Sequence, residues 1–239
     1  MNLDFTNLKV LVTGGTRGIG EQVAKDISNL GGSVTITGTK SPTWKHSNIE
    51  FAKVDFLDGI EFSNFLKYAR KKEFDVCINN AGINRISSLL EIDTKDWNDV
   101  LQVNLTAPSM IMQTVSESMK KKSFGRIVNI SSIWGGVGKE KRCSYSSTKF
   151  GIRGLTVSAA AELSQFNILI NTVSPGFTLT DLTRESLSQK EMKEICLKIP
   201  MKRMAETHDI SSSIVFLSSK ANTYISGQNI IVDGGYSSV

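Results

Sequence analysis

The sequence predicts an α/β protein in which helices cover both faces of a single parallel sheet. Short runs of apolar and β-branched residues alternate with helical patterns along most of the 239 residues. Each run is almost unbroken, as is typical of strands that are buried on both faces. Because crossovers between parallel strands are right-handed, this alternation indicates a doubly wound sheet.

The expected elements follow one another without a linker, a repeat or a low-complexity segment, so we expect one domain over residues 1–239. Strand patterns lie at 9–13, 33–37, 49–54, 75–79, 125–130, 168–173 and 229–235. Helical patterns lie at 18–30, 60–72, 95–121, 145–164 and 209–218. Only "GTKSPTWKHSN" separates the second and third strands, and it contains Pro42, so we expect a short loop there in place of a crossover helix.

The composition argues against several classes of protein. Hydrophobic residues make up 40% of the chain and charged residues 21%, which is ordinary for a globular domain. No apolar run approaches the roughly 18 residues of a membrane span, and the N-terminus has no signal-peptide pattern, so we expect a cytoplasmic location. Cys77, Cys143 and Cys196 are widely spaced and form no C-x-x-C pair, which predicts neither a disulfide framework nor a metal site. The net charge of +5 is mild and scattered, which does not favour nucleic-acid binding.

A glycine-rich turn, "LVTGGTRGIG", joins the first expected strand to the first expected helix. Glycines are needed where the backbone turns tightly and approaches a diphosphate at a helix N-terminus. Gly14, Gly18 and Gly20 occupy this turn, and the G-K-[ST] sequence of nucleotide triphosphatases is absent. The pattern therefore favours a dinucleotide, although the same turn could be a tight loop alone.

The residues after the second expected strand indicate which dinucleotide is bound. NAD-type folds place an acid there to hold the ribose 2′-hydroxyl. This chain has "TGTK" instead, with Thr39 and Lys40 and no carboxylate, and it has Arg17 in the glycine-rich turn. Two cations and a hydroxyl suit a 2′-phosphate, so we expect NADP(H). The alternative is that Arg17 and Lys40 are solvated loop residues.

Six motifs, in order along the chain, resemble those of the short-chain dehydrogenase/reductase family. They are "TGGTRGIG", "NNAG", "VNLTA", "NISS", "YSSTK" and "SPGFTLT", and "MKRMAE" with "YISGQNIIVDGG" is similar to 3-oxoacyl-[acyl-carrier-protein] reductases. The resemblance implies a seven-stranded Rossmann fold, a homotetramer and a catalytic tetrad, which maps onto Asn104, Ser132, Tyr145 and Lys149. Ser132 is preferred to its neighbour Ser131 because it lies 13 positions before Tyr145, the usual spacing in the family.

The cofactor residues are taken partly from the glycine-rich pattern and partly from the resemblance. Those expected near the phosphates and the adenosine ribose are Gly14, Thr16, Arg17, Gly18, Ile19, Gly20, Thr39 and Lys40. The resemblance places Asp55 and Phe56 near the adenine, and Asn80, Ala81 and Gly82 near a ribose. It places Tyr145, Lys149, Pro175, Gly176 and Thr178 at the nicotinamide end, with Thr180 reaching a phosphate.

The i, i+4 pair of Tyr145 and Lys149 suggests the chemistry. A ketone that accepts hydride needs a proton on its oxygen, and Tyr145 can donate it. We expect the charge of Lys149 to lower the pKa of Tyr145, and Lys149 to hold the nicotinamide ribose. Ser132 would hydrogen-bond the substrate oxygen, and Asn104 would hold a water that links Lys149 to solvent.

The substrate is the least defined part of the prediction. Carrier-protein reductases usually have a basic residue before each of two strands, and this chain has Ser123 and Phe166 there. Acyl carrier protein is therefore one possible partner, and a keto-sugar or other polar metabolite, as in surface-polysaccharide synthesis, is the alternative substrate. A non-catalytic NADP-binding sensor is a remote alternative, because all four tetrad residues are present. A substrate lid is expected at about 179–201.

Overall fold

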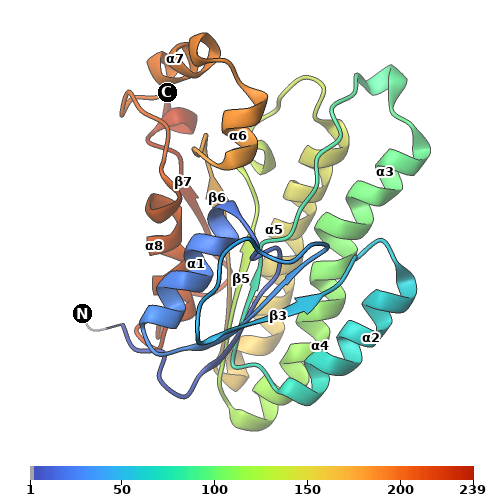
Figure 1. Ribbon diagram of the computed structural model, residues 1–239, viewed down its shortest axis with the longest axis vertical. Helices are drawn as coiled ribbons and strands as arrows, with labels where there is room; N and C mark the ends of the chain where they lie inside the picture. Colours follow the sequence, from blue (N-terminus) through green and yellow to red (C-terminus); the bar gives the residue numbers. More distant parts are fainter. Residues whose placement is uncertain (1–2) are drawn as a thin grey trace.

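The computed structural model describes residues 3–239, except for the side chains of Leu182 and Ser186. Its centre is a seven-stranded sheet in the order β3-β2-β1-β4-β5-β6-β7, with every neighbouring pair parallel (Figure 1). The strand order reverses direction after β1, as a doubly wound sheet requires. The predicted fold class is confirmed, including the seven strands of the Rossmann fold.

The elements agree closely with the sequence patterns. The strands are β1 (Lys9–Val12), β2 (Ser33–Gly38), β3 (Ile49–Lys53), β4 (Val76–Asn79), β5 (Gly125–Ile130), β6 (Ile168–Pro175) and β7 (Asn229–Val232). The α-helices are α1 (Gly18–Asn29), α2 (Gly59–Lys72), α3 (Thr94–Leu101), α4 (Ala107–Lys122), α5 (Cys143–Leu163), α6 (Asp181–Ser186), α7 (Gln189–Lys198) and α8 (Thr207–Ser218).

Two apolar clusters hold the layers together, one on each face of the sheet. On one face, α1 packs against β1, β2 and β3 and α8 packs against β4 to β7, through residues such as Ile27 and Ile214. On the other face, α2, α4 and α5 contribute residues such as Phe65, Ile111 and Ala160 (Figure 1). The inner strands are buried on both faces, which explains why their sequences are apolar without alternation.

The connection between β2 and β3 contains no helix, as the Pro42-containing loop predicted. The long helix expected at 95–121 is instead divided. A π-helical turn, Gln102–Thr106, lies between α3 and α4 and carries Asn104. Single π turns within α-helices are often found at functional sites, because the extra residue re-aims a side chain. Here Asn104 hydrogen-bonds to the backbone of Ile83, a contact that the helical sequence pattern could not indicate.

The predicted lid segment consists of two helices, α6 and α7, which lie at the carboxyl end of the strands (Figure 1). A capping box fixes the start of α7, where Ser188 and Glu191 exchange hydrogen bonds. Within residues 3–239, no helix is long and apolar enough to cross a membrane.

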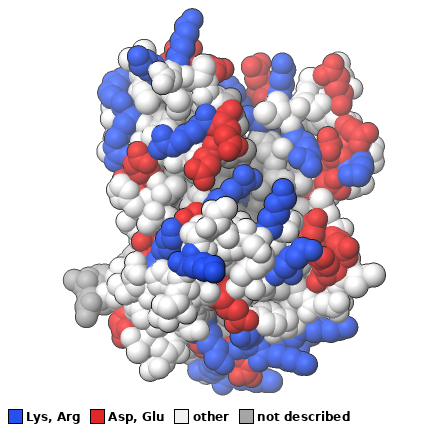
Figure 2. Space-filling view, viewed as in Figure 1, with Lys and Arg blue, Asp and Glu red and all other residues white. Residues whose placement is uncertain are grey.

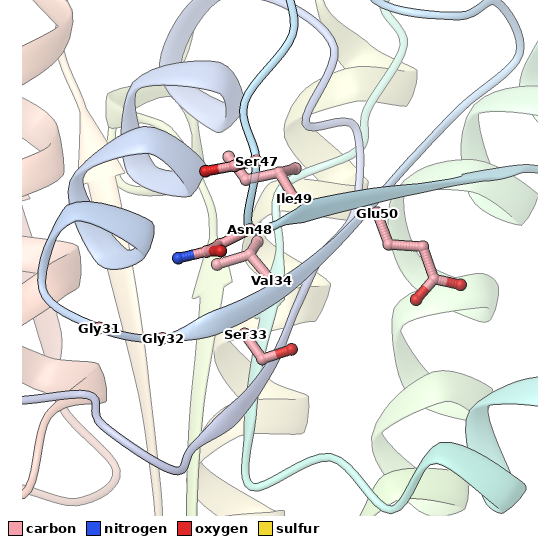
Figure 3. A pocket seen from close by; sticks show the side chains of 8 residues that line it. All are labelled: Gly31, Gly32, Ser33, Val34, Ser47, Asn48, Ile49 and Glu50. Atoms are coloured by element: carbon pink, nitrogen blue, oxygen red, sulfur yellow. The ribbon is translucent and has the colours of Figure 1, made fainter.

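A pocket at the opposite end of the sheet lies where β2 and β3 begin (Figure 3). It is lined by residues 31–34 and 47–50, and its only ionisable side chain is Glu50. That carboxylate points away from the pocket and accepts hydrogen bonds from Lys72 and Tyr68 instead. The glycine-rich turn and the tetrad are at the carboxyl end of the strands, so this pocket is not part of the candidate site.

Candidate active site

The tight turn between β1 and α1 forms one end of the site. Gly14 and Gly18 have positive φ values of 64° and 59°, which residues with a Cβ rarely adopt. A Cβ at Gly14 would lie 2.8 Å from the Cα of Ala81, so the turn packs directly against the segment after β4. Arg17 precedes α1 in an extended conformation, and its side chain does not cap the helix. The first N–H groups of α1 can therefore bind an anion such as a diphosphate.

Asn80 fixes this turn to β4. Its Nδ2 atom donates to the backbone oxygens of Thr13, at 3.0 Å, and Gly14, at 2.9 Å. A Cβ at Gly20 would collide with the same Nδ2 atom, which explains the third glycine of the motif. Both amide hydrogens of Asn80 serve the fold, so a ribose contact from this residue would use its side-chain oxygen or its backbone.

Thr39 and Lys40 follow β2, and both are exposed, as is Arg17. A Cβ at Gly38 would lie 2.7 Å from Cγ2 of Thr16, so Gly38 lets the end of β2 pack against the glycine-rich turn. Lys and Arg side chains gather around the hollow in the middle of the face in Figure 2, between the α6–α7 segment and α3. Asp and Glu side chains lie beside the same hollow, so the surroundings are of mixed charge, and the Lys and Arg side chains among them can attract a phosphorylated cofactor.

Trp44 anchors the β2–β3 loop to the glycine-rich turn. Its indole N–H donates to the backbone oxygen of Thr16 at 3.1 Å, and Nζ of Lys25 lies 4.8 Å from its ring centre. His46 is hydrogen-bonded to Ser28 of α1 at 3.1 Å. The loop that carries Lys40 is therefore held against α1 by specific contacts, which the sequence analysis did not foresee.

Asp55 and Phe56 come directly after β3, at the expected adenine position. The backbone N–H of Asp55 donates to Glu61 at 2.8 Å. The Phe56 ring is 6% exposed and packs edge-on against Phe62 at a centroid distance of 5.2 Å. Because that ring belongs to the core beneath α2, a cofactor contact from Phe56 would come from its backbone.

The predicted nicotinamide residues follow β6 in the order Pro175, Gly176, Thr178 and Thr180. A Cβ at Gly176 would lie 2.7 Å from the Cα of Asp233, so this chain segment passes close to the end of β7. Thr180 caps α6, and its methyl group would be 3.3 Å from a Cβ at Gly18. The segment after β6 thus meets the glycine-rich turn, as a shared phosphate contact requires.

The tetrad residues Asn104 and Lys149 meet at Gly82. A Cβ at Gly82 would be 3.4 Å from Oδ1 of Asn104 and 3.7 Å from Nζ of Lys149. Lys149 is buried, donates to the backbone oxygen of Ile130 at 2.8 Å, and lies 5.4 Å from the centre of the Tyr145 ring. The absence of a side chain at Gly82 therefore leaves space between the amide and the ammonium group.

Ser131 and Ser132 have different roles in the structure. The Ser131 hydroxyl is buried and donates to the backbone oxygen of Lys149 at 2.8 Å, which links β5 to α5. Ser132 accepts from the N–H of Trp134 at 3.2 Å and is close enough to Tyr145 for its hydroxyl to act on the pKa of the phenol. This geometry supports the choice of Ser132 as the catalytic serine.

Burial sets the protonation of the central pair. It raises the pKa of Tyr145, and this rise is only opposed by the hydrogen bond from Ser132 and the charge of Arg142. Burial also lowers the pKa of Lys149 to about 8. In the protein without its cofactor, desolvation of the phenol outweighs the charge of Arg142, and the expectation that Lys149 beside the positive nicotinamide lowers the pKa of Tyr145 stays a prediction for the complex. Arg142, which the sequence analysis missed, is the residue whose charge acts on Tyr145.

Three aromatic rings from distant parts of the chain converge beside Ser132, and they too were not predicted. Phe177 lies 5.9 Å from Trp134 and 5.3 Å from Tyr236, all edge-on. Each ring comes within two residues of a recognised motif, at "NISS", "SPG" and "DGG", and this placement is the signal that could have identified them. We call these three residues the aromatic wall.

Comparison with known proteins agrees with this geometry. The family described as short chain dehydrogenase matches residues 8–191. The 3-oxoacyl-[acyl-carrier-protein] reductase FabG of Aquifex aeolicus is 37% identical, with 94% of this chain and 95% of FabG covered. The structure of ElxO with NADP bound superposes with a TM-score of 0.89 at 33% identity, over 97% of this chain and 99% of ElxO. A gluconate 5-dehydrogenase from Burkholderia cenocepacia, in complex with NADP and tartrate, has a TM-score of 0.91 at 25% identity, over 100% and 98% of the two chains.

A doubly wound sheet with a glycine-rich turn and a Tyr–Lys pair defines an oxidoreductase that acts on CH–OH groups. The chain belongs to the short-chain dehydrogenase/reductase family. The resemblance predicted from the six motifs is thus confirmed, and so is the similarity to 3-oxoacyl-[acyl-carrier-protein] reductases.

Proposed function

We propose that this protein interconverts a ketone and a secondary alcohol, with Tyr145 as the acid that protonates the ketone oxygen. The observation that carries this proposal is the placement of Tyr145 between Ser132, whose hydroxyl acts to lower the pKa of the phenol, and Lys149, whose Nζ lies 5.4 Å from the centre of its ring. Ser132 holds the substrate oxygen as negative charge develops there. Lys149 and Asn104 flank the space at Gly82 through which a proton can be replaced from solvent.

NADP(H) is the cofactor, and structures of the similar proteins ElxO and gluconate 5-dehydrogenase contain NADP. The bound cofactor supplies the hydride. The fit of this chain is supported by the uncapped start of α1, and by Gly14 and Gly18, whose missing Cβ atoms let the backbone approach a diphosphate. We assign the 2′-phosphate to Arg17, Thr39 and Lys40, and the nicotinamide ribose to Tyr145 and Lys149. For the other residues expected near the cofactor, we propose the same phosphate, ribose, adenine and nicotinamide contacts that the sequence predicts.

The first candidate substrate is a 3-oxoacyl thioester, because the curated relative from Aquifex aeolicus is named for that reaction. Docking of an acidic carrier protein, however, needs several cations close together. Phe166 replaces one expected cation, and Lys120 stacks on its ring at 4.2 Å. Ser123 replaces the other, and the neighbouring Lys122 is occupied by an ion pair with Asp75 at 2.8 Å.

The second candidate is a soluble polar ketone, such as a keto-sugar or a sugar acid in surface-polysaccharide synthesis. The missing docking cations favour it, and so does the similarity to a gluconate 5-dehydrogenase. Both candidates require the same acid, the same oxyanion contact and the same cofactor, and they differ only in what holds the rest of the substrate.

One experiment separates the two candidates. Steady-state rates are measured with NADPH and the same 3-oxoacyl chain, presented as a small thioester and on acyl carrier protein. We expect kcat/KM values within about tenfold of each other, since the docking cations are missing. A preference of more than about a hundredfold for the carrier-bound chain, roughly 2.7 kcal/mol in transition-state binding, would establish the carrier-dependent reaction instead.

We also propose a homotetramer in the cytoplasm. Phe150 and Val157 on α5 are 48% and 56% exposed, and Ile231 on β7 is 48% exposed. The three side chains line one groove between α5 and β7, together with polar residues such as Arg153 and Gln228, and a second copy of the chain could cover these exposed apolar side chains. Light scattering should give about four times the 26.2 kDa of one chain, and a monomeric mass would reject this assembly.

A further inference from the structure

The aromatic wall of Trp134, Phe177 and Tyr236 lies outside the hydrophobic core. Its rings contact one another edge-on, with centroid distances of 5.9, 6.1 and 5.3 Å. All three side chains are half-buried, and none of them belongs to either apolar cluster or packs against it within the described residues. Because large aromatic side chains gain most when they are buried, three half-exposed rings gathered outside the core call for another contact.

The wall begins at the serine that would hold the ketone oxygen. Trp134 lies in the 3₁₀ turn Ile133–Gly135, and its backbone N–H donates to Oγ of Ser132 at 3.2 Å. Phe177 comes directly after Gly176, which the proposed function places at the nicotinamide. A ketone held by Ser132 would therefore have the rings of the wall beside one of its substituents.

The wall also offers polar atoms to a ligand. Within the described residues, the indole N–H of Trp134 and the hydroxyl of Tyr236 have no hydrogen-bond partner, and neither atom is buried. The exposed Lys139 adds a third donor at the rim, with Nζ 6.0 Å from the centre of the Trp134 ring. An alkyl chain against the wall would take water from these groups and return no hydrogen bond. A polyhydroxylated molecule would place C–H groups on the rings and oxygens at the donors.

We propose that the aromatic wall is the subsite for the carbon skeleton of a polyhydroxylated ketone, such as a keto-sugar or a cyclic polyol ketone. The C–H groups of the substrate would lie against the rings, while Nε1 of Trp134 and Oη of Tyr236 would hydrogen-bond to its hydroxyl groups. The protein would then prefer such ketones to alkyl ketones of the same size. This inference rests on the proposed function, because it takes Ser132 as the group that holds the ketone oxygen.

The test uses pairs of ketones that differ in their hydroxyl groups. Dihydroxyacetone has two hydroxyls where 3-pentanone has two methyl groups, and pentahydroxycyclohexanone is the hydroxylated partner of cyclohexanone. Values of kcat/KM are measured with NADPH. Binding without turnover is followed on the full-length protein with NADP⁺ by saturation-transfer NMR, in which aromatic protons of the protein are irradiated and transfer to the C–H protons of the ketone is recorded.

We expect the wild type to prefer the hydroxylated member of at least one pair by about tenfold or more, and to transfer saturation to it. Tyr236→Phe and Trp134→Phe each remove one donor and keep a ring, so each should reduce this preference about threefold or more, with the loss falling on the hydroxylated ketone. Phe177→Leu should reduce the saturation transfer. Tyr224→Phe, at a tyrosine that is 95% exposed and outside the wall, is the matched control and should keep the full preference.

The inference is overturned if neither pair shows a preference for the hydroxylated ketone, including the case in which the hydroxylated compounds neither bind nor react. It is also overturned if Tyr236→Phe and Trp134→Phe lower kcat/KM equally for both members of a pair, as a purely structural wall would require. A loss of this kind with a changed mass in light scattering would identify the wall as a contact between copies of the chain.

Failure of this inference can be distinguished from failure of the proposed function. If the hydroxylated ketones receive saturation through the wall residues but no ketone is reduced, the assignment of the wall stands and the proposed function fails. If alkyl ketones are reduced as well as hydroxylated ones, the proposed function stands and the role of the wall fails.

Discussion

At the scale of single residues, burial sets the pKa values of the ionisable side chains in this site. Lys149 is placed on α5 by the same helical spacing that presents Tyr145, yet it is only 4% exposed, and within the described residues the one hydrogen bond of its ammonium group goes to the backbone oxygen of Ile130. A buried ammonium group without a carboxylate has lost its hydration, and this lowers the pKa of Lys149 to about 8. Near neutral pH the residue is still mostly charged, but it is poised to exchange its proton.

The lowered pKa of Lys149 predicts how the free energy of unfolding depends on pH. An unfolded lysine has a pKa of roughly 10.4, so between about pH 8 and pH 10 the unfolded chain binds more protons than the folded one at this residue. The contribution of Lys149 to the free energy of unfolding should therefore rise with pH across this window, by up to about 3 kcal/mol. Below pH 8 its destabilising effect is fully present.

Urea unfolding of the cofactor-free wild type and of Lys149→Met, from pH 7 to pH 10, measures the effect. The advantage of the variant over the wild type should shrink as the pH rises, because other titrating groups cancel in the difference. Lys141→Met, at an exposed site, should show a difference that does not depend on pH. Parallel pH profiles for the wild type and Lys149→Met would show that the buried lysine is not desolvated.

At the scale of elements, loops and strands hold the site residues by specific contacts. The β2–β3 loop has no helix to stiffen it, and Trp44 supplies the support through its hydrogen bond to Thr16 and its contact with Lys25.

Beneath the tetrad, a buried chain of amides and hydroxyls connects three strands to α5. Asn79 donates to Asn129 at 2.8 Å, Asn129 donates to Thr156 at 2.9 Å, and Thr172 also donates to Thr156.

Removing the Trp44 contacts should weaken NADPH binding without changing the chemistry. We expect Trp44→Ala to raise the dissociation constant for NADPH about three- to tenfold and to reduce the preference for NADPH over NADH. Trp44→Phe keeps a ring for Lys25 and should have a smaller effect. Fluorescence titration of both reduced cofactors gives the constants, and kcat should stay within about twofold. An equal loss of NADPH and NADH affinity would mean that Trp44 supports the fold and not the 2′-phosphate site.

The buried amide chain makes a prediction about the sheet. Asn129→Leu leaves a buried donor on Asn79 without its partner, which costs about 1–3 kcal/mol, whereas the hydroxyl of Thr156 keeps its hydrogen bonds with Thr172 and Ile152. We expect the free energy of unfolding to fall by about 1–3 kcal/mol in urea denaturation. Asn64→Leu, on the exposed face of α2, is the matched control and should change it by less than about 0.5 kcal/mol. A cost no greater than that of the control would refute this role.

At the scale of the whole molecule, the sequence patterns predict the fold, and the site residues that they name stay a prediction. Continuous apolar strands, the glycine-rich turn and the missing helix after β2 each follow from local residue properties, and the structure agrees with all three. The π turn at Asn104 could not be predicted, because it depends on a hydrogen bond to Ile83 across the fold. The orientation of Arg142 and the aromatic wall likewise depend on which distant segments meet, and the pKa of Tyr145 depends on how completely they bury it.

The central claim is that Tyr145 protonates the ketone. Tyr145→Phe removes one hydroxyl and leaves the ring, Lys149 and the glycine-rich turn in place. The decisive measurement is the single-turnover rate of NADPH oxidation by this variant, with the best ketone of the wild type, beside the NADPH dissociation constant. We expect the rate to fall at least a hundredfold while NADPH affinity stays within about twofold. A variant that kept a tenth or more of the wild-type rate would show that another group is the acid.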